Sequence, residues 1–477
     1  MKKHILTLLL AALLTLSAVS CGSGTDTETA AQDTDTPAET IAETEAEPTF
    51  ADFPAQDFAG TALRLGDTEQ YDICKFSIRE ELNGDILNDA IFNSLRSVEE
   101  KLNVLVTPVY FGDPGQLANA VIAGDDFCDI MTGQDLRMAN LALEGYTMDI
   151  SHLEQLDFDA PWWPEHAVAS YRINNNMLLF SNYMSYFGVS RARVWFINKQ
   201  LCEDFGMTVP YEDVFNGTWT LDKLHSMIGT VYTDTNGNGT VDEGDTVGYT
   251  NENNYICLQS SFDVHTFASD KNGQLEYVFD LERGSMALEK MYAMLYENTG
   301  VFQSKNGGRI DQTMFRDGNS LFYYDSLGMA ETILRETDVE YGVLCTPKLE
   351  ESQADYIATY TDYSHAVPKT ISDQNLVGWS IEALTASGYY TIIPAFVDVC
   401  LTNKYVYDED SAKVIRLIGE KMHVELAYSF SAHMANVFLN LLNNNNPSTN
   451  LASYYAKHEK EDLALMENLN NLYGSAE

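Results

Sequence analysis

The sequence predicts an α/β protein whose folded body has two lobes, and two observations lead to this fold class. Behind an N-terminal segment of about 58 residues, about 420 residues remain, which is more than one ordinary hydrophobic core holds. In the first part of this body, β-rich runs alternate with helical patterns. That alternation is typical of a parallel sheet covered by helices.

The first elements can be predicted in order from their apolar spacing. Residues 61–65 (TALRL) alternate like a strand, and residues 85–102 carry Leu and Ile at the three- and four-residue intervals of an amphipathic helix. A β-rich run, a helical run and a short buried strand follow at 104–111, 116–123 and 128–131. The sequence therefore predicts a strand–helix–strand–helix–strand order.

This order also predicts where polar residues gather. Ligands of parallel sheets bind at the carboxyl ends of the strands. Asp67 follows the first strand, and the turn 133–135 follows the third, so both are expected on one rim of the sheet. The alternative is that these residues serve only the geometry of their turns.

The N-terminus has the organisation of a secretory signal peptide, which we place at residues 1–20. Lys2 and Lys3 precede an apolar run at 5–16, which is too short for a bilayer that needs about 20 residues. Small residues then lead to Cys21, an arrangement that resembles the lipobox of bacterial lipoproteins, although Ala18 stands where leucine is usual. The resemblance implies lipidation of Cys21, and plain secretion is the alternative.

Composition excludes several classes of partner. Residues 21–58 are rich in Thr, Ala, Glu and Asp and are predicted to form a disordered, acidic linker. The net charge of −43 argues against binding nucleic acid or anionic lipid. No further run of 18 apolar residues occurs, so the predicted membrane contact is the lipid anchor alone, on the outer face of the cell membrane.

Six cysteines follow Cys21, far apart and without metal-ligand spacing. In an exported protein they can form disulfides, but the favoured prediction is buried thiols that behave as small apolar side chains. They are Cys74, Cys128, Cys202, Cys257, Cys345 and Cys400.

Residues 234–245 fit the twelve-residue loop of an EF-hand. Oxygen-bearing side chains stand at positions 1, 3, 5, 9 and 12, with Gly239 at the sharp turn of position 6. Ca²⁺ takes six to eight oxygen ligands, so the loop predicts a structural Ca²⁺ site. A turn without metal is the alternative. The predicted ligands are Asp234, Asn236, Asn238, Thr240 (through its carbonyl), Asp242 and Asp245.

No catalytic motif stands out. The sequence has no GxSxG, HExxH or P-loop, and His423 and His433 lie ten residues apart without metal spacing. A pair of acids acting as in a glycosidase stays open, because the chain has 71 acidic residues and the sequence selects no two of them.

The segment 194–250 resembles the sugar-type extracellular solute-binding proteins of bacterial ABC importers. It contains VWFINKQLCEDFGM, then NGTWTLDKL, then the calcium-like loop, then Gly-Tyr. Segments 84–104, 127–151, 315–326 and 339–348 are similar to further motifs of that family, in the same order. The resemblance covers the body from about residue 60.

The resemblance implies a two-lobed periplasmic-binding-protein-like (type II) fold with a cleft between the lobes. Lobe 1 is predicted at 59–188 plus about 364–430, and lobe 2 at 189–363 plus about 431–477. Crossing segments are expected near 189–194, 361–367 and 425–440.

The resemblance also implies a function. The protein is expected to capture a carbohydrate, most simply an oligosaccharide, and to deliver it to an ABC importer permease. It is expected to act as a monomeric receptor without catalysis. The alternatives are a lipid-anchored glycoside hydrolase and an adhesin. A dockerin-like adhesin is disfavoured because it carries two calcium loops. The ligand residues that the resemblance implies are Asp67, Gln134, Asp135, Tyr324, Asp325, Asp362 and Tyr363.

Overall fold

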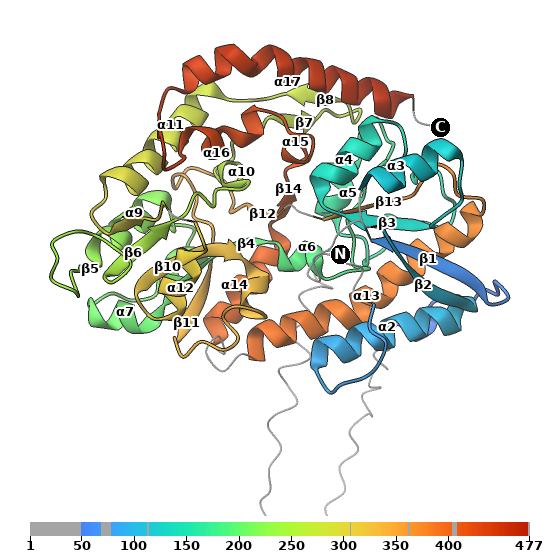
Figure 1. The fold of residues 1–477 in the computed structure, drawn as a ribbon, viewed down its shortest axis with the longest axis horizontal. Coiled ribbons are helices and arrows are strands. Elements are labelled where there is room, and N and C mark those ends of the chain that lie inside the picture. Colours follow the sequence, from blue (N-terminus) through green and yellow to red (C-terminus); the bar gives the residue numbers. More distant parts are fainter. Residues whose placement is uncertain are drawn as a thin grey trace, which may run out of the picture. The chain divides into compact units, whose positions relative to one another are not determined.

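Two separate β-sheets organise the computed structural model of the chain. The model describes residues 49–67, 78–111, 114–305, 307–360, 363–402 and 408–475. Both sheets lie within the single compact unit Pro48–Glu477. We call the elements around the first sheet lobe 1 and those around the second sheet lobe 2 (Figure 1). The predicted signal peptide, Cys21, most of the linker, Cys74 and Asp362 lie outside the described residues.

Lobe 1 is built on a four-stranded sheet in the order β13-β3-β1-β2. β1 pairs in parallel with both β2 and β3, as the alternating pattern predicts, whereas β13 is antiparallel to β3. In Figure 1, α2 and α13 lie along one face of the sheet and α3 and α4 along the other. The bounds are β1 Thr61–Asp67, α2 Ile86–Leu102, β2 Val104–Tyr110, α3 Pro114–Ala123, β3 Ile130–Gly133, α4 Asp135–Leu143, α5 Glu165–Tyr171, β13 Ser364–Ala366 and α13 Gln374–Thr402.

Local signals explain the ends of α2. Asp85 caps its first turn, with its carboxylate accepting from the backbone N–H of Asn88 at 3.0 Å. Asn103 ends the helix in the left-handed conformation that asparagine tolerates. The apolar stripe between these ends packs against α13. The prediction of a helix over 85–102 is therefore confirmed.

Helix α13 is long and apolar enough to cross a membrane by length and composition, which the sequence analysis did not anticipate. However, 61% of its most apolar window is buried inside the protein, where it packs against α2. It is a core helix of lobe 1 in this structure.

Lobe 2 is built on a mixed sheet in the order β11-β4-β10-β6-β5, with β9 paired to β6. β7 and β8 form a separate two-stranded antiparallel sheet. The bounds are β4 Arg193–Asn198, α7 Lys199–Asp204, α8 Tyr211–Phe215, α9 Leu221–Thr230, β5 Tyr232–Thr233, β6 Thr246–Asn251, α10 Leu258–Ser261, β7 Phe267–Ser269, β8 Leu275–Tyr277, α11 Leu281–Tyr292, η4 Ala293–Glu297, β9 Val301–Gln303, α12 Ile310–Arg316, β10 Ser320–Ser326, η5 Leu327–Ala330, β11 Tyr341–Cys345, α14 Glu409–Glu420, α16 Val437–Leu441 and α17 Leu451–Gly474.

The motifs of the segment 194–250 have physical roles in lobe 2. Asn198 ends β4 and caps α7 through a hydrogen bond from the backbone N–H of Leu201, at 3.1 Å. Lys199 pairs with Asp408 at 2.6 Å. Trp219 is fully buried and donates its indole N–H to the carbonyl of Cys345, at 3.0 Å. Trp219 is thus a core residue.

Three segments of the described chain lie between the two sheets (Figure 1). We call them the first, second and third crossing and, together, the junction. The first contains α6 (Phe187–Ser190) and leads into β4. The second contains β12 (Ala358–Tyr360), and the third contains β14 (Met422–Val424) followed by α15 (Leu426–Ser429) and η6 (Met434–Asn436). β12 and β14 pair in parallel, and β14 packs against α5 of lobe 1 whereas β12 contacts α10 and β4 of lobe 2.

The predicted lobe boundaries can be compared with the packing of the C-terminal part of the chain. β14 pairs with β12 at 422–424, directly before the region 425–440 where the third crossing was expected. Residues 364–430 were expected in lobe 1, yet α14 packs against β11 and α8 of lobe 2. The Ser411 hydroxyl accepts from the backbone N–H of Val343 at 3.1 Å and so attaches α14 to β11.

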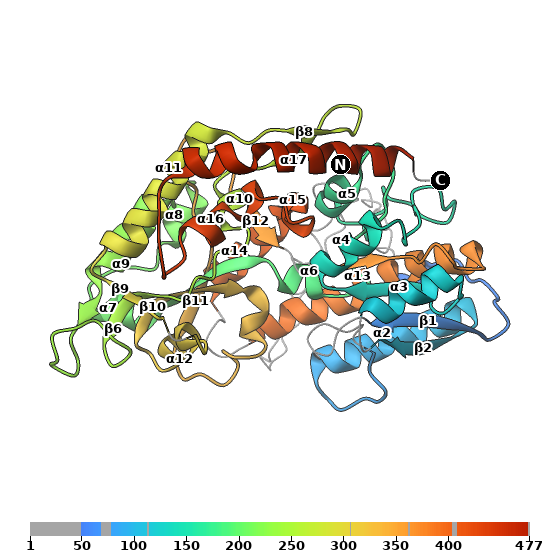
Figure 2. The ribbon, with the colours of Figure 1, turned by 45° about the horizontal axis from the view of Figure 1, so that its top comes forward.

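Helix α17 runs along both lobes in Figure 2. Its first part packs on α11 and β8 of lobe 2. Its last turn accepts hydrogen bonds from lobe 1, because Asn174 donates to the carbonyl of Asn470 at 2.8 Å and Asn176 to that of Tyr473. The five described cysteines after Cys74 are buried thiols, as the favoured prediction had it.

Candidate functional site

One edge of the lobe 1 sheet brings together four predicted ligand residues. The parallel register places Asp67 at the end of β1, beside Thr132 of β3. Ser364 lies opposite Gly133, so Tyr363 and Gln134 flank the same antiparallel pair. Gln134 begins α4 without a side-chain capping bond and is only partly buried, so its amide is available for a ligand.

Asp135 is held by elements from two parts of the chain. Its side chain is almost fully buried and accepts from the hydroxyls of Tyr171 in α5 and Ser429 in α15, each at 3.3 Å. Burial, reinforced by the Asp135 charge, raises the pKa of Tyr171, which therefore stays a neutral donor. Asp135 thus connects the lobe 1 rim to the third crossing.

Tyr324 and Asp325 lie at the end of β10, in lobe 2. Tyr324 is buried, with its ring 5.0 Å from that of Trp195. Asp325 accepts from the Tyr323 hydroxyl at 2.7 Å and pairs with Arg193 at 3.3 Å and with Arg309. Burial opposes ionisation of Asp325, but the two guanidinium groups outweigh it and hold its pKa below the ordinary value.

The first crossing joins these two groups of residues. Tyr363 of the lobe 1 group packs on Phe187, with ring centres 5.2 Å apart, and Arg191 lies 5.8 Å from the centre of the Tyr363 ring. Two residues later, Arg193 pairs with Asp325 of the lobe 2 group. The predicted ligand residues therefore border the junction from both lobes.

The junction contains a small cavity. It is lined by residues of α5, the first crossing, β12 and β14, and it has room for about one water molecule. His166 faces Tyr360 there, with ring centres 5.6 Å apart, and burial lowers the pKa of His166 to about 3, so the ring is neutral. The lining residues are Pro164, His166, Ser181, Asn182, Tyr183, Ser185, Gly188, Val189, Tyr360 and Met422.

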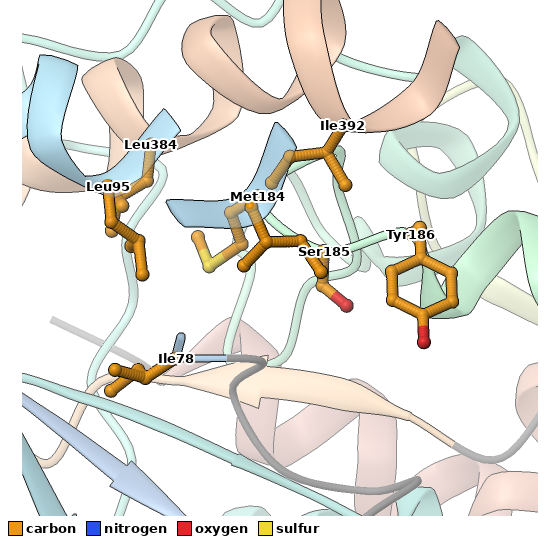
Figure 3. A pocket seen from close by; sticks show the side chains of 8 residues that line it. Ile78, Leu95, Met184, Ser185, Tyr186, Leu384 and Ile392 are labelled. Carbon is orange, nitrogen blue, oxygen red and sulfur yellow. The ribbon is translucent and has the colours of Figure 1, made fainter. Parts of the chain in front are cut away.

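A second cavity lies between α2, α13 and the first crossing (Figure 3). Its lining is almost entirely aliphatic and aromatic, and it shares Ser185 with the cavity of the junction. Such a surface does not match a hydroxyl-rich ligand.

The calcium-like loop forms a closed set of hydrogen bonds. The Asp234 carboxylate accepts from the backbone N–H groups of Gly237, Asn238 and Gly239, at 2.7 to 3.2 Å. Asp245 is fully buried and accepts from the backbone N–H groups of Thr235 and Asp242. The side chains at the other predicted ligand positions converge by mutual bonds: Asn236 to Asp242 at 2.9 Å, Asn238 to Asp242, and Thr240 to Asn238.

Sequence reasoning missed the histidines of the junction. His423 and Glu425 come from the third crossing, and His265 from the segment before β7. His423 lies in β14 and Glu425 follows directly after it, and a two-residue spacing in an extended segment puts two side chains on one face, which was the available signal. The third member is 158 residues away and carried no signal.

Solved structures with the same fold are receptors of sugar importers. The ABC substrate-binding protein Lmo0181 of Listeria monocytogenes, solved with cycloalternan, is similar at TM-score 0.55 and 12% identity, over 86% of this chain and 99% of its own. The galacto-N-biose/lacto-N-biose I-binding protein of Bifidobacterium longum is similar at TM-score 0.58 and 12% identity, over 87% and 99%.

The GacH receptor of Streptomyces glaucescens is similar at TM-score 0.52 and 15% identity, over 88% of this chain and all of its own. No protein-family model and no curated protein sequence matches the chain. The similarity therefore shows the fold, which is the two-lobed fold of periplasmic binding proteins that the motif order predicted.

Proposed function

We propose that the protein is an exported receptor that captures a carbohydrate for an ABC importer and does not transform it. The observation that carries the proposal is the two-lobed fold itself, shared over nearly the full length of receptors solved with cycloalternan and lacto-N-biose. Carboxylates, amides and aromatic rings border the junction from both lobes, and these groups suit a neutral, hydroxyl-rich ligand.

The proposed mechanism is a shift between open and closed arrangements of the lobes. The junction cavity has room for about one water molecule, so a sugar needs the lobes to move apart at the three crossings. A ligand that contacts both lobes favours the closed form by its differential affinity. The closed form then presents both lobes to the permease.

A ligand panel tests the proposal. Purified protein is mixed with neutral mono- and oligosaccharides, and melting temperature and small-angle scattering radius are measured. We expect at least one sugar to raise the melting temperature and reduce the scattering radius. We also expect no new reducing ends on prolonged incubation. If every sugar leaves both quantities unchanged, or if reducing ends accumulate, the proposal is wrong.

A matched pair of variants locates the ligand. Gln134→Ala removes a partly buried amide that makes no capping bond, and we expect the affinity for the identified sugar to fall about tenfold, the value of one lost hydrogen bond. Asn140→Ala, on the exposed side of α4, is the control. Equal affinity in both variants removes Gln134 from the site.

We also propose that the 234–245 loop binds Ca²⁺ as a structural ion. In favour are its oxygen-bearing side chains, two of which (Asn236 and Asn238) hydrogen-bond Asp242, and the buried end of the loop at Asp245. Calorimetric titration of Ca²⁺ tests this proposal. Asp234→Ala should abolish the heat, whereas Asp270→Ala, which alters another exposed acidic turn, should retain it. Identical traces for Asp234→Ala and the parent refute the site.

Finally, we propose that residues 1–20 are removed and that Cys21 carries lipid, which anchors the receptor outside the cell membrane. Two acyl chains give stable anchoring where one does not. Detergent phase partitioning of the expressed protein tests this. The parent should enter the detergent phase and Cys21→Ala the aqueous phase, and partitioning of both into water supports plain secretion.

A further inference from the structure

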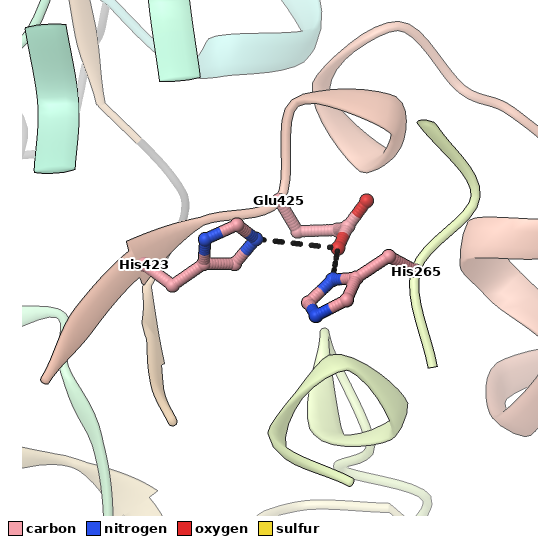
Figure 4. A group of neighbouring side chains, drawn as sticks. All are labelled: His265, His423 and Glu425. Atoms are coloured by element: carbon pink, nitrogen blue, oxygen red, sulfur yellow. Dashed lines mark hydrogen bonds and ion pairs between the residues drawn. The ribbon is translucent and has the colours of Figure 1, made fainter. Parts of the chain in front are cut away.

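Two histidines and a glutamate meet at the edge of the junction, on the lobe 2 side. His423 lies in β14 and Glu425 follows that strand, while His265 comes from the segment between α10 and β7 of lobe 2 (Figure 4). None of these residues belongs to the predicted ligand set or to the calcium-like loop. The third crossing and lobe 2 thus each supply part of the cluster.

The geometry matches the first coordination shell of a tetrahedral metal ion. The ligand atoms lie within 4.8 Å of one another. The Glu425 carboxylate oxygen is 3.1 Å from Nδ1 of His265 and 3.7 Å from Nε2 of His423. Ligand atoms about 2.0 Å from a tetrahedral Zn²⁺ are about 3.3 Å apart. The two distances from Glu425 lie on either side of that value, and the two imidazole nitrogens lie within 4.8 Å of each other.

The surrounding groups are already arranged to orient these ligands. Nδ1 of His265 faces Glu425, while Nε2 of the same ring lies 3.5 Å from the Asp263 carboxylate. The Ser260 hydroxyl donates to Glu425 at 2.6 Å. A carboxylate behind a ligating histidine fixes its tautomer and orientation and makes it a better ligand.

The cluster is accessible on one side. The Glu425 side chain is 3% exposed, whereas His423 is 35% exposed and His265 is 21% exposed. A buried carboxylate with two partly exposed imidazoles leaves a path for an ion and room for water as the remaining ligand.

We propose that His265, His423 and Glu425 bind a divalent transition metal of the Zn²⁺ type. Two imidazoles and one carboxylate are a ligand set that zinc takes in proteins, with a fourth position left for water. The ion would tie the third crossing to lobe 2. Because β14 also packs against α5 of lobe 1, the ion would bind where the third crossing meets both lobes. The site is independent of the proposed sugar capture.

Zinc binds the neutral form of imidazole, so its affinity for this cluster should fall as the pH is lowered. The charged groups next to the ligands are Asp263, 3.5 Å from His265, and Arg283, 3.8 Å from Asp263.

A second cluster of the same composition provides the control. His433, His458 and Glu461 also lie close together, but the Glu461 side chain is 62% exposed. A variant in this cluster therefore tests whether a bound metal belongs to the junction.

The test is calorimetric titration of Zn²⁺ into the full, EDTA-treated chain at pH 7.5, repeated in two buffers that differ in ionisation enthalpy. We expect one site whose heat depends on the buffer, as proton release requires. His423→Gln should abolish it, Asp263→Asn should weaken it about 10- to 100-fold, and His433→Gln should leave it unchanged. Asn suits the left-handed conformation at position 263, so the fold is preserved.

Co²⁺ absorption spectra of the same variants give a second measurement, since tetrahedral nitrogen ligation produces strong visible bands that His423→Gln should remove. Melting temperatures without metal check that each variant is folded. Three outcomes overturn the proposal: no zinc binding by the parent, equal binding by parent and His423→Gln, or a site that His433→Gln removes.

Discussion

Asp325 provides the sharpest test of how lobe 2 is held together. The sequence resemblance assigned it to the ligand, but the structure places its carboxylate between Arg193, Arg309 and the Tyr323 hydroxyl. The perturbation is Asp325→Asn, which keeps the shape of the side chain and removes its charge. The Arg193 and Asp325 side chains are only 6% and 7% exposed, so the loss leaves a guanidinium in a buried position.

The expected magnitude follows from this geometry. At 3.3 Å and an effective dielectric constant of about 20, the attraction between Arg193 and Asp325 is about 5 kcal/mol. The cost of removing both charges from water offsets part of this attraction. Removing one partner of a buried pair leaves the other charge unpaired and lowers the free energy of unfolding by about 3–5 kcal/mol. We therefore expect the free energy of unfolding of Asp325→Asn to fall by about 3 kcal/mol at pH 7.

The assay is urea unfolding followed by tryptophan fluorescence, because Trp195 lies next to Tyr324 in the same sheet. Asp317→Asn is the control, since the Arg316–Asp317 pair is half exposed at 47% and 50% and its loss should cost under about 1 kcal/mol. If Asp325→Asn matches this control, the carboxylate does not stabilise lobe 2 and is free to serve a ligand.

The same variant gives a pH test with a definite sign. The pKa of Asp325 in the folded protein lies below the ordinary value. Its contribution is therefore complete above the unfolded pKa of about 3.9 and is lost as the pH falls toward the folded pKa. The difference between parent and Asp325→Asn should be constant from pH 7 to pH 5 and shrink below pH 4.

Two further predictions concern lobe 1. Gly388→Ala places a methyl group 1.8 Å from the backbone oxygen of Tyr183, so α13 and the first crossing must separate. We expect the free energy of unfolding, followed by thermal unfolding, to fall by at least about 1–3 kcal/mol. An unchanged melting temperature would show that the two segments separate freely. Glu382→Ala leaves the indole N–H groups of Trp162 and Trp163, which donate at 2.7 and 2.8 Å, without their acceptor. We expect the free energy of unfolding to fall by about 2–5 kcal/mol, with altered tryptophan fluorescence. A fall of under about 1 kcal/mol would mean that water replaces the Glu382 carboxylate as the acceptor.

The strand and helix order of lobe 1 was predictable because it arises from neighbours along the chain. Apolar spacing and a capping aspartate define α2, and the alternation in 61–65 defines β1. The motif order from 194 to 250 predicted the fold, and the structure explains it: Asn198 caps a helix and Trp219 fills a core. Such local requirements recur wherever the fold recurs.

The candidate site was predictable only in part. Strand ends mark ligand residues in parallel sheets, so Asp67 and Gln134 were correctly expected on one rim. The ion pairs of Asp325 could not be predicted, because they depend on Arg193 and Arg309, which no local pattern links to it.

The sequence by itself determined the order of the first elements, the acidic character, the export signal that we propose and the type of fold, because each follows from residues close together in the chain. The tertiary structure alone decided that β13 runs antiparallel, that α14 joins lobe 2, and that β14 pairs with β12. It also brought His265 to Glu425 across 160 residues. Contacts of that kind depend on how two lobes close around three connections, and no spacing along the chain encodes them.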